Sequence, residues 1–153
     1  MNKLSHFDEA GSPRMVDVSA KDTTRRTARA HAFVKIQPQV LAQLPHNPKG
    51  DPLEIARVAG IMAAKRTAGL IPLCHPLPLS HADIEITVEE GGVRIISTAA
   101  TRAQTGVEME AMTGACIAAL TVYDMTKALD KAIEITDVYL LEKTGGKSGD
   151  FHR

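Results

Sequence analysis

Aromatic residues are scarce in this sequence. Phe, Trp and Tyr together make up 3% of the 153 residues, and tryptophan is absent. The core must therefore be built from Ala, Val, Ile, Leu and the six Met residues, which bury less area per side chain and let helices pack closely. Because the net charge is also zero, which promotes association, we expect a homo-oligomer.

Excess charge of one sign and long apolar runs are also missing, and cysteine is scarce. Eighteen basic residues balance eighteen acidic ones, which disfavours a nucleic-acid partner. The only cysteines, Cys74 and Cys116, are expected to be free thiols. No run reaches the ~18 apolar residues of a membrane span, and residues 1–11 are polar, so we expect neither a span nor a secretory signal. The length suits one domain over residues 1–153, and we expect a cytoplasmic protein with no membrane partner.

The spacing of apolar residues predicts the order of secondary-structure elements. Strict alternation indicates strands, and apolar residues three and four apart indicate helices. Asp51 is the expected N-cap of the first long helix, with Pro52 at its first position, and Gly91-Gly92 is the expected hairpin turn. The predicted elements are a strand at 24–36, a short helical piece at 38–44, a helix at 51–68, a rigid loop at 69–78, strands at 84–90 and 93–102, a helix at 107–131 and a strand at 133–141.

This order predicts an α+β, ferredoxin-like βαββαβ fold, an antiparallel sheet with both helices on one face. A polar N-terminal arm (about 1–14) and a glycine-rich tail (about 144–153) flank the domain. The tail is not a Walker A loop, because position 141 is Leu and no helix can follow. It either folds over an anion or is a disordered C-terminus.

Charged residues near the two ends of the long helix are candidates for chemistry. Asp124, Lys127 and Lys131 share one face of the predicted helix, and they form either a solvated ion pair or an acid–base group in a concave site. Glu108 and Glu110 either complement the helix dipole or bind a ligand. Glu110 and Asp124 are separated by roughly 21 Å along the axis. A single small ligand can touch both only if it is long or if two chains share the pocket.

A metal site is not expected. Cys74 and His75 are adjacent, which does not match the spacing of a chelating turn, and no second Cys/His pair follows His81. We expect Cys74 to be a small buried residue and His75 to be a hydrogen-bonding or acid–base group.

Seven short segments carry the strongest signal, and they run in order over nearly the whole chain. They are Met15–Ser19, Lys49–Asp51, Ala63–Thr67, Leu70–Leu77, Thr105–Ala111, Tyr123–Lys127 and Gly145–Phe151. Together they closely resemble the molybdenum cofactor biosynthesis protein C family.

That resemblance implies a cyclic pyranopterin monophosphate synthase, a lyase. It would convert (8S)-3',8-cyclo-7,8-dihydroguanosine 5'-triphosphate to cyclic pyranopterin monophosphate with release of diphosphate. The resemblance implies a hexamer of three dimers with sites at subunit interfaces, and Asp124 and Lys127 as catalytic residues. The implied substrate contacts are Leu73, Cys74, His75, Met109 and Glu110, with Arg26, Lys49, Lys65 and Lys147 as further basic groups.

No cofactor is expected, because proton transfer and phosphate cyclisation need carboxylates and cations rather than electron transfer. Assistance by Mg²⁺ is left open. One alternative is a non-catalytic nucleotide-sensing ferredoxin-like domain, which would bind without turnover. An RNA-binding module is disfavoured, because the predicted strands at 84–90 and 93–102 carry no aromatic residue.

Overall fold

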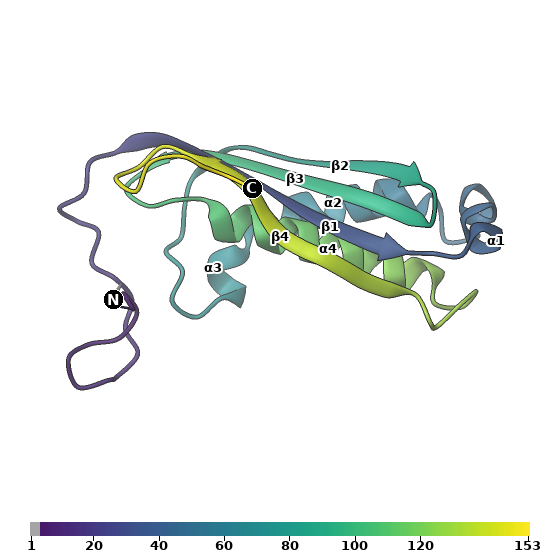
Figure 1. The fold of residues 1–153 in the computed structure, drawn as a ribbon, viewed down its shortest axis with the longest axis horizontal. Helices are drawn as coiled ribbons and strands as arrows, with labels where there is room; N and C mark the ends of the chain where they lie inside the picture. The colour runs from purple at the N-terminus through teal and green to yellow at the C-terminus, as the bar shows by residue number, and fades with distance from the viewer. Residues whose placement is uncertain (1–3) are drawn as a thin grey trace.

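The computed structural model describes residues 4–153, so the first three residues of the predicted arm lie outside the described part. The main strands and the two long helices follow one another in the order that the sequence predicts (Figure 1). They are β1 (Thr24–Lys35), α1 (Pro38–Leu41), the 3₁₀ helix η1 (Leu44–His46), α2 (Pro52–Lys65), α3 (Thr67–Leu70), β2 (Leu79–Glu89), β3 (Gly92–Ala103), α4 (Glu108–Thr126), β4 (Glu134–Thr144) and β5 (Phe151–His152).

The strands form one antiparallel sheet in the order β2-β3-β1-β4-β5. Helices α2 and α4 lie side by side on the same face of this sheet, which leaves the other face uncovered in the single chain (Figure 1). The predicted ferredoxin-like α+β class is therefore confirmed. Among the described residues, no helix has the length and apolar character needed to cross a membrane.

The core is built from small side chains, as the shortage of aromatics requires. Alternate residues of β1 and one face of α4 are fully buried. At Gly60 of α2, an added Cβ would lie 2.9 Å from the backbone oxygen of Gly114 in α4, so the two helices are in close contact there. The fully buried alanines of β1 and α4 are Ala28, Ala30, Ala32, Ala111, Ala115, Ala118 and Ala119.

The start of α2 confirms the predicted cap. The Asp51 carboxylate accepts hydrogen bonds from the backbone N–H groups of Leu53 (2.9 Å) and Glu54 (3.3 Å), and Pro52 occupies the first helical position. These bonds satisfy donors that the helix itself leaves unpaired.

The second long helix is shorter than predicted, since it ends at Thr126 instead of Lys131. The buried Ile133 (6% exposed) must return to the core to begin the path of β4, so the chain reverses its direction over residues 127–132. Lys131 consequently does not share a helix face with Asp124. Nothing in Ala128 and Leu129 signals the end, because both residues are good helix formers.

Two other boundaries also differ from the prediction. The helical backbone is interrupted at Arg66 (φ −112°). The predicted helix at 51–68 is therefore α2 followed by the separate short α3, which extends into the predicted loop. In the hairpin, Gly92 already belongs to β3, and the turn is formed by Glu90 and Gly91, whose φ of 82° suits glycine.

The C-terminal tail is ordered, so the interpretation as a disordered terminus is wrong. Strand β4 continues to Thr144, three residues beyond its predicted end, and β5 pairs with it. Gly145, Gly146 and Gly149 all have positive φ, which turns the chain back onto the sheet. The Asp150 carboxylate accepts a hydrogen bond from the backbone N–H of Gly145 (3.1 Å) and closes this loop.

Candidate active site

The candidate residues gather at the two ends of α4, which runs the length of the sheet (Figure 1). Its C-terminal end lies towards α1, and its N-terminal end lies towards α3 and the arm. We call Lys49, Asp124 and Lys127 the C-terminal cluster. We call Lys65, Cys74, His75 and Glu110 the N-terminal cluster.

In the C-terminal cluster, the Lys127 ammonium lies 2.7 Å from the Asp124 carboxylate. Lys127 is the C-cap residue of α4 and keeps a helical backbone, so the predicted pairing three residues apart survives the early helix end. The hydrogen bond from Lys127 holds the pKa of Asp124 below its usual range, and the same contact raises the pKa of Lys127. The two side chains are 60% and 50% exposed, so the single chain leaves the pair in solvent.

Lys49 joins this pair from the loop before α2. Its ammonium lies close enough to Asp124 to lower the pKa of that carboxyl further, although by less than Lys127 does. A pocket of about 250 Å³ adjoins the cluster and is lined partly by Lys49 and Met125. The structure thus brings together one carboxylate and two ammonium groups from distant parts of the sequence.

In the N-terminal cluster, Glu110 is a buried carboxyl. It is 4% exposed, and its Oε2 atom finds no hydrogen-bond partner among residues 4–153. Burial raises its pKa to about 7, and the neighbouring Glu108 carboxylate adds to this shift. A pocket of about 100 Å³ lies beside it, lined in part by Lys65 and Arg66. A carboxyl that ionises near neutrality can both accept and donate a proton.

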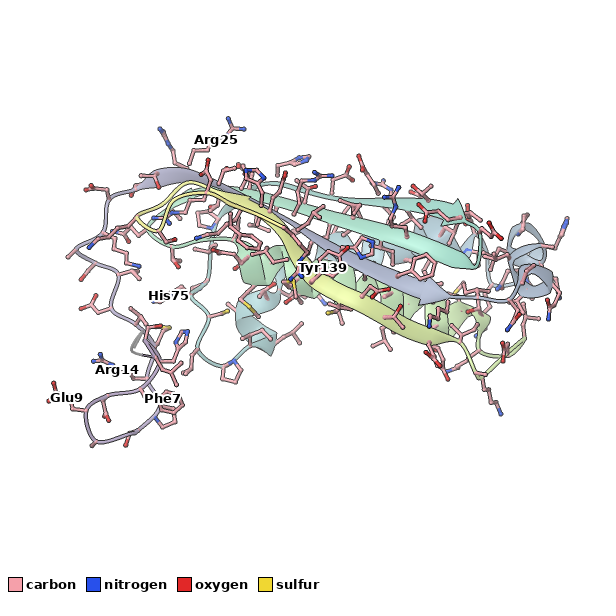
Figure 2. All side chains as sticks on the ribbon, in the orientation of Figure 1. Phe7, Glu9, Arg14, Arg25, His75 and Tyr139 are labelled. Atoms are coloured by element: carbon pink, nitrogen blue, oxygen red, sulfur yellow. The ribbon has the colours of Figure 1, made fainter. Side chains whose placement is uncertain are left out.

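The segment after α3 supplies the other members of this cluster. Burial raises the pKa of the Cys74 thiol, and the Glu110 carboxylate raises it further, which places Cys74 close to Glu110. His75 Nε2 donates a hydrogen bond to the backbone oxygen of Val16 in the arm, at 2.6 Å. Figure 2 shows His75 on the segment after α3, on the side of that segment that faces the arm. Leu73 is partly exposed on this segment, and Met109, 39% exposed, precedes Glu110 in the first turn of α4.

Arg26 and Lys147 belong to neither cluster. They line a separate pocket of about 850 Å³ at the same end of the sheet as Glu110. Arg26 Nε donates to the backbone oxygen of Ala103 at 3.1 Å, which fixes one side of its guanidinium. The pocket is also lined by Glu108, which the sequence analysis names as a candidate, and by Lys143, which the sequence prediction misses. The two side chains form an ion pair at 3.3 Å. Lys143 is missed because the predicted strand ends at Leu141, which leaves that lysine unassigned. Continuing the strand would have placed it at the end of the sheet.

The structure therefore groups the predicted residues into separate sites within one chain. The Glu110 side chain and the Asp124 side chain belong to opposite ends of the 19-residue α4. No small ligand can contact both in one chain, as the sequence predicts. Within the described residues, no three metal-ligating side chains come together, and Cys74 and Cys116 are both free thiols.

The fold and the site define a ferredoxin-like α+β protein that carries carboxyl groups and several cations at the two ends of α4. Residues 15–146 match the model of the MoaC family. The chain is 56% identical to the cyclic pyranopterin monophosphate synthase of Streptomyces avermitilis, over 99% of this chain and 91% of the relative. It is 55% identical to the protein of the same name from Deinococcus radiodurans, over 97% of this chain and 89% of the relative. A third protein of that name, from Dinoroseobacter shibae, is 52% identical over 99% of this chain and 98% of the relative. The chain belongs to the MoaC family.

Proposed function

We propose that this protein is a cyclic pyranopterin monophosphate synthase, a lyase of molybdenum cofactor biosynthesis. The observation that carries the proposal is the shared name of relatives that are more than half identical over nearly the whole chain. The substrate is a nucleotide-derived triphosphate, (8S)-3',8-cyclo-7,8-dihydroguanosine 5'-triphosphate. The products are cyclic pyranopterin monophosphate and diphosphate.

The residue types suit this reaction. Opening the purine imidazole ring and closing a pyran ring require proton transfers, which the Asp124–Lys127 pair and Glu110 can provide. In the cyclisation, a substrate hydroxyl attacks the α-phosphorus, the bond from that phosphorus to the diphosphate oxygen breaks, and the hydroxyl proton passes to a base. The cations Lys49, Lys65, Arg26 and Lys147 are proposed to neutralise the phosphate charge as the diphosphate departs.

A product assay tests the proposal. The purified protein is incubated with the cyclic dihydroguanosine triphosphate, and the products are identified by mass spectrometry and by phosphorus NMR. Formation of cyclic pyranopterin monophosphate with an equal amount of diphosphate is expected. If the ligand binds but returns unchanged, the chain is a nucleotide-sensing domain instead. The same assay after dialysis against EDTA tests our further proposal that no resident cofactor is needed, and adding Mg²⁺ back shows whether this ion assists.

We also propose that the active site is shared between chains of a homo-oligomer, with the C-terminal cluster of one chain facing the N-terminal cluster of its neighbour. Two features support this. The Asp124–Lys127 pair is mostly exposed in one chain, and solvent screens the charges of an exposed pair. The helical layer also exposes apolar side chains, including Val58, Met62 and Leu120, that a second chain could cover. A cytoplasmic hexamer of three dimers is the assembly we propose.

Mixing two inactive variants tests the shared site. Glu110→Ala and Asp124→Ala proteins are each expected to be inactive. After the two are dissociated and reassembled together, a mixed dimer would contain one pocket with both substitutions and one with neither. A fraction of wild-type activity should therefore return. If mass spectrometry shows that subunits have exchanged and no activity returns, the shared-site proposal is wrong.

A further inference from the structure

In the loop that carries Lys49, the side chain of Asn47 is hydrogen-bonded to the end of α4. Asn47 Nδ2 donates a hydrogen bond to the backbone oxygen of Met125 at 2.8 Å. Asn47 Oδ1 accepts one from the backbone N–H of Lys49 at 2.9 Å. The amide of Asn47 therefore connects the residue next to Asp124 with the backbone of Lys49.

Both hydrogen bonds of the Asn47 side chain can hold the loop in position against α4. The Met125 carbonyl lies in the last turn of α4, where helix carbonyls lack partners within the helix. The bond to the Lys49 N–H is a local side-chain to backbone contact that shapes a turn. A backbone hydrogen bond from the Gly50 N–H to the backbone oxygen of Asn47, at 3.1 Å, tightens the same turn. Gly50 has a φ of 104°, which favours glycine.

The rest of the loop leaves few other ways to place Lys49. After Gly50, Asp51 caps α2, so the loop is fixed on its C-terminal side to that helix. Lys49 itself is exposed, and its ammonium forms no ion pair shorter than 4.0 Å with the described residues. The backbone of Lys49 thus lies between the Asn47 bond to α4 on one side and the cap of α2 on the other.

We propose that Asn47 is a positioning residue that holds the Lys49 ammonium beside the Asp124–Lys127 pair. The inference rests on the proposed function and deepens it, because it assigns the C-terminal cluster a cation for the substrate's phosphates. In this arrangement Asn47 does not touch the substrate. It acts through the backbone of Lys49, so its loss should resemble the loss of the Lys49 side chain.

A double-mutant cycle with Asn47→Ala and Lys49→Ala tests the coupling. Binding of the triphosphate substrate is measured by calorimetry on the full-length proteins. Asn47→Ala is expected to weaken binding about fivefold in the wild-type background and less than about twofold when Lys49 is already Ala. The reason is that the effects of substitutions at two contacting residues do not add. A purely structural Asn47 would weaken binding equally in both backgrounds, and that result would overturn the proposal. Gln43→Ala is the matched control. Gln43 lines the same pocket of about 250 Å³, and its amide also donates to a backbone oxygen, but that oxygen belongs to Gln39 (3.1 Å) and not to α4, so the position of Lys49 and the binding of the substrate should not change.

A second readout does not depend on turnover. Two ammonium groups, those of Lys127 and Lys49, lower the pKa of the Asp124 carboxyl. In carbon-detected NMR titrations, Lys49→Ala should raise the pKa of Asp124, Asn47→Ala should raise it in the same direction, and Gln43→Ala should not. If Asn47→Ala leaves the Asp124 titration unchanged, the positioning role is wrong even in an active synthase. If the wild-type protein makes no product, the proposed function is wrong, and the titration still tests whether Asn47 places Lys49.

Discussion

The two ends of α4 put carboxyl groups into opposite environments. Glu110, in the first turn, is buried, one of its oxygens has no hydrogen-bond partner within residues 4–153, and its pKa rises to about 7. Asp124, in the last turn, is exposed and paired with Lys127, and its pKa falls. Burial without a partner favours the neutral acid, whereas an ammonium in contact favours the ion. One helix thus offers a group that can carry a proton at neutral pH and another that stays ionised, and this separation defines the acid–base roles that we propose.

The largest expected effects concern the exposed end. Asp124→Asn and Lys127→Ala should each lower the rate of product formation by about a hundredfold to ten-thousandfold, the usual contribution of a general acid or base. The fold should be unchanged, because both side chains are mostly exposed in one chain. Single-turnover product assays on the assembled protein measure the effect.

Lys131→Ala is the matched control for this prediction. Lys131 lies beyond the end of α4 and is exposed, so its loss should leave the rate nearly normal. Near-normal turnover in Asp124→Asn or Lys127→Ala, with the oligomer intact, would contradict the catalytic role of the pair.

At the buried end, Glu110→Gln should change how stability depends on pH. The carboxyl ionises near 4.5 when unfolded and near 7 in the fold. Between these values the folded chain keeps a proton that the unfolded chain has lost, so the free energy of unfolding falls as pH rises through this window. Glu110→Gln removes that fall. Above about pH 7 the variant should be more stable than the wild type by at most about 3 kcal/mol, and below about 4.5 the advantage should disappear. Urea unfolding across this pH range measures the difference.

The same experiment on Asp124→Asn sharpens the contrast between the ends. The lowered pKa of Asp124 has the opposite sign, so any stability it contributes is present above its unfolded pKa and is lost as the pH falls through its folded pKa. Since Asp124 is exposed, this contribution should be small. A raised unfolding free energy at neutral pH in Asp124→Asn, and none in Glu110→Gln, would reverse our description of the two ends.

A smaller effect is expected from the cations that accompany each end. Lys49→Ala and Lys65→Ala should weaken binding of a triphosphate ligand by roughly tenfold, the size of one charge-assisted hydrogen bond. The loss should shrink with the corresponding monophosphate, because the partner of the lysine is then absent. Calorimetric titrations with both ligands provide the comparison. Equal losses for the two ligands would show that the lysines do not bind the terminal phosphates.

Local patterns predict most of the fold, whereas the site residues follow from the family resemblance and stay a prediction. The alternation in β1, the cap at Asp51 and the apolar spacing of α2 and α4 depend on neighbouring residues, so they can be read from the sequence. The end of α4 cannot, because it is decided by the need to bury Ile133, a tertiary requirement. The two-residue β5 is too short to show a pattern. The link between Asn47 and Met125 joins positions 78 residues apart, which no local pattern encodes.

The smallest predicted effect concerns a helix start, where α2 and α4 differ. The first turn of α2 is capped by the Asp51 side chain, whereas Val107 at the start of α4 provides no side-chain hydrogen bond. Asp51→Ala should therefore lower the free energy of unfolding by about 1 kcal/mol, and Asp51→Ser should restore most of it, since a serine oxygen can accept the same bonds. Chemical denaturation of the three proteins measures the difference. Because Asp51 is two residues from Lys49, triphosphate binding should weaken less than about threefold in Asp51→Ala, for Asn47 still holds the loop to α4. A loss of binding as large as that of Lys49→Ala would mean that the cap of α2, and not the Asn47 amide, determines where the Lys49 ammonium lies.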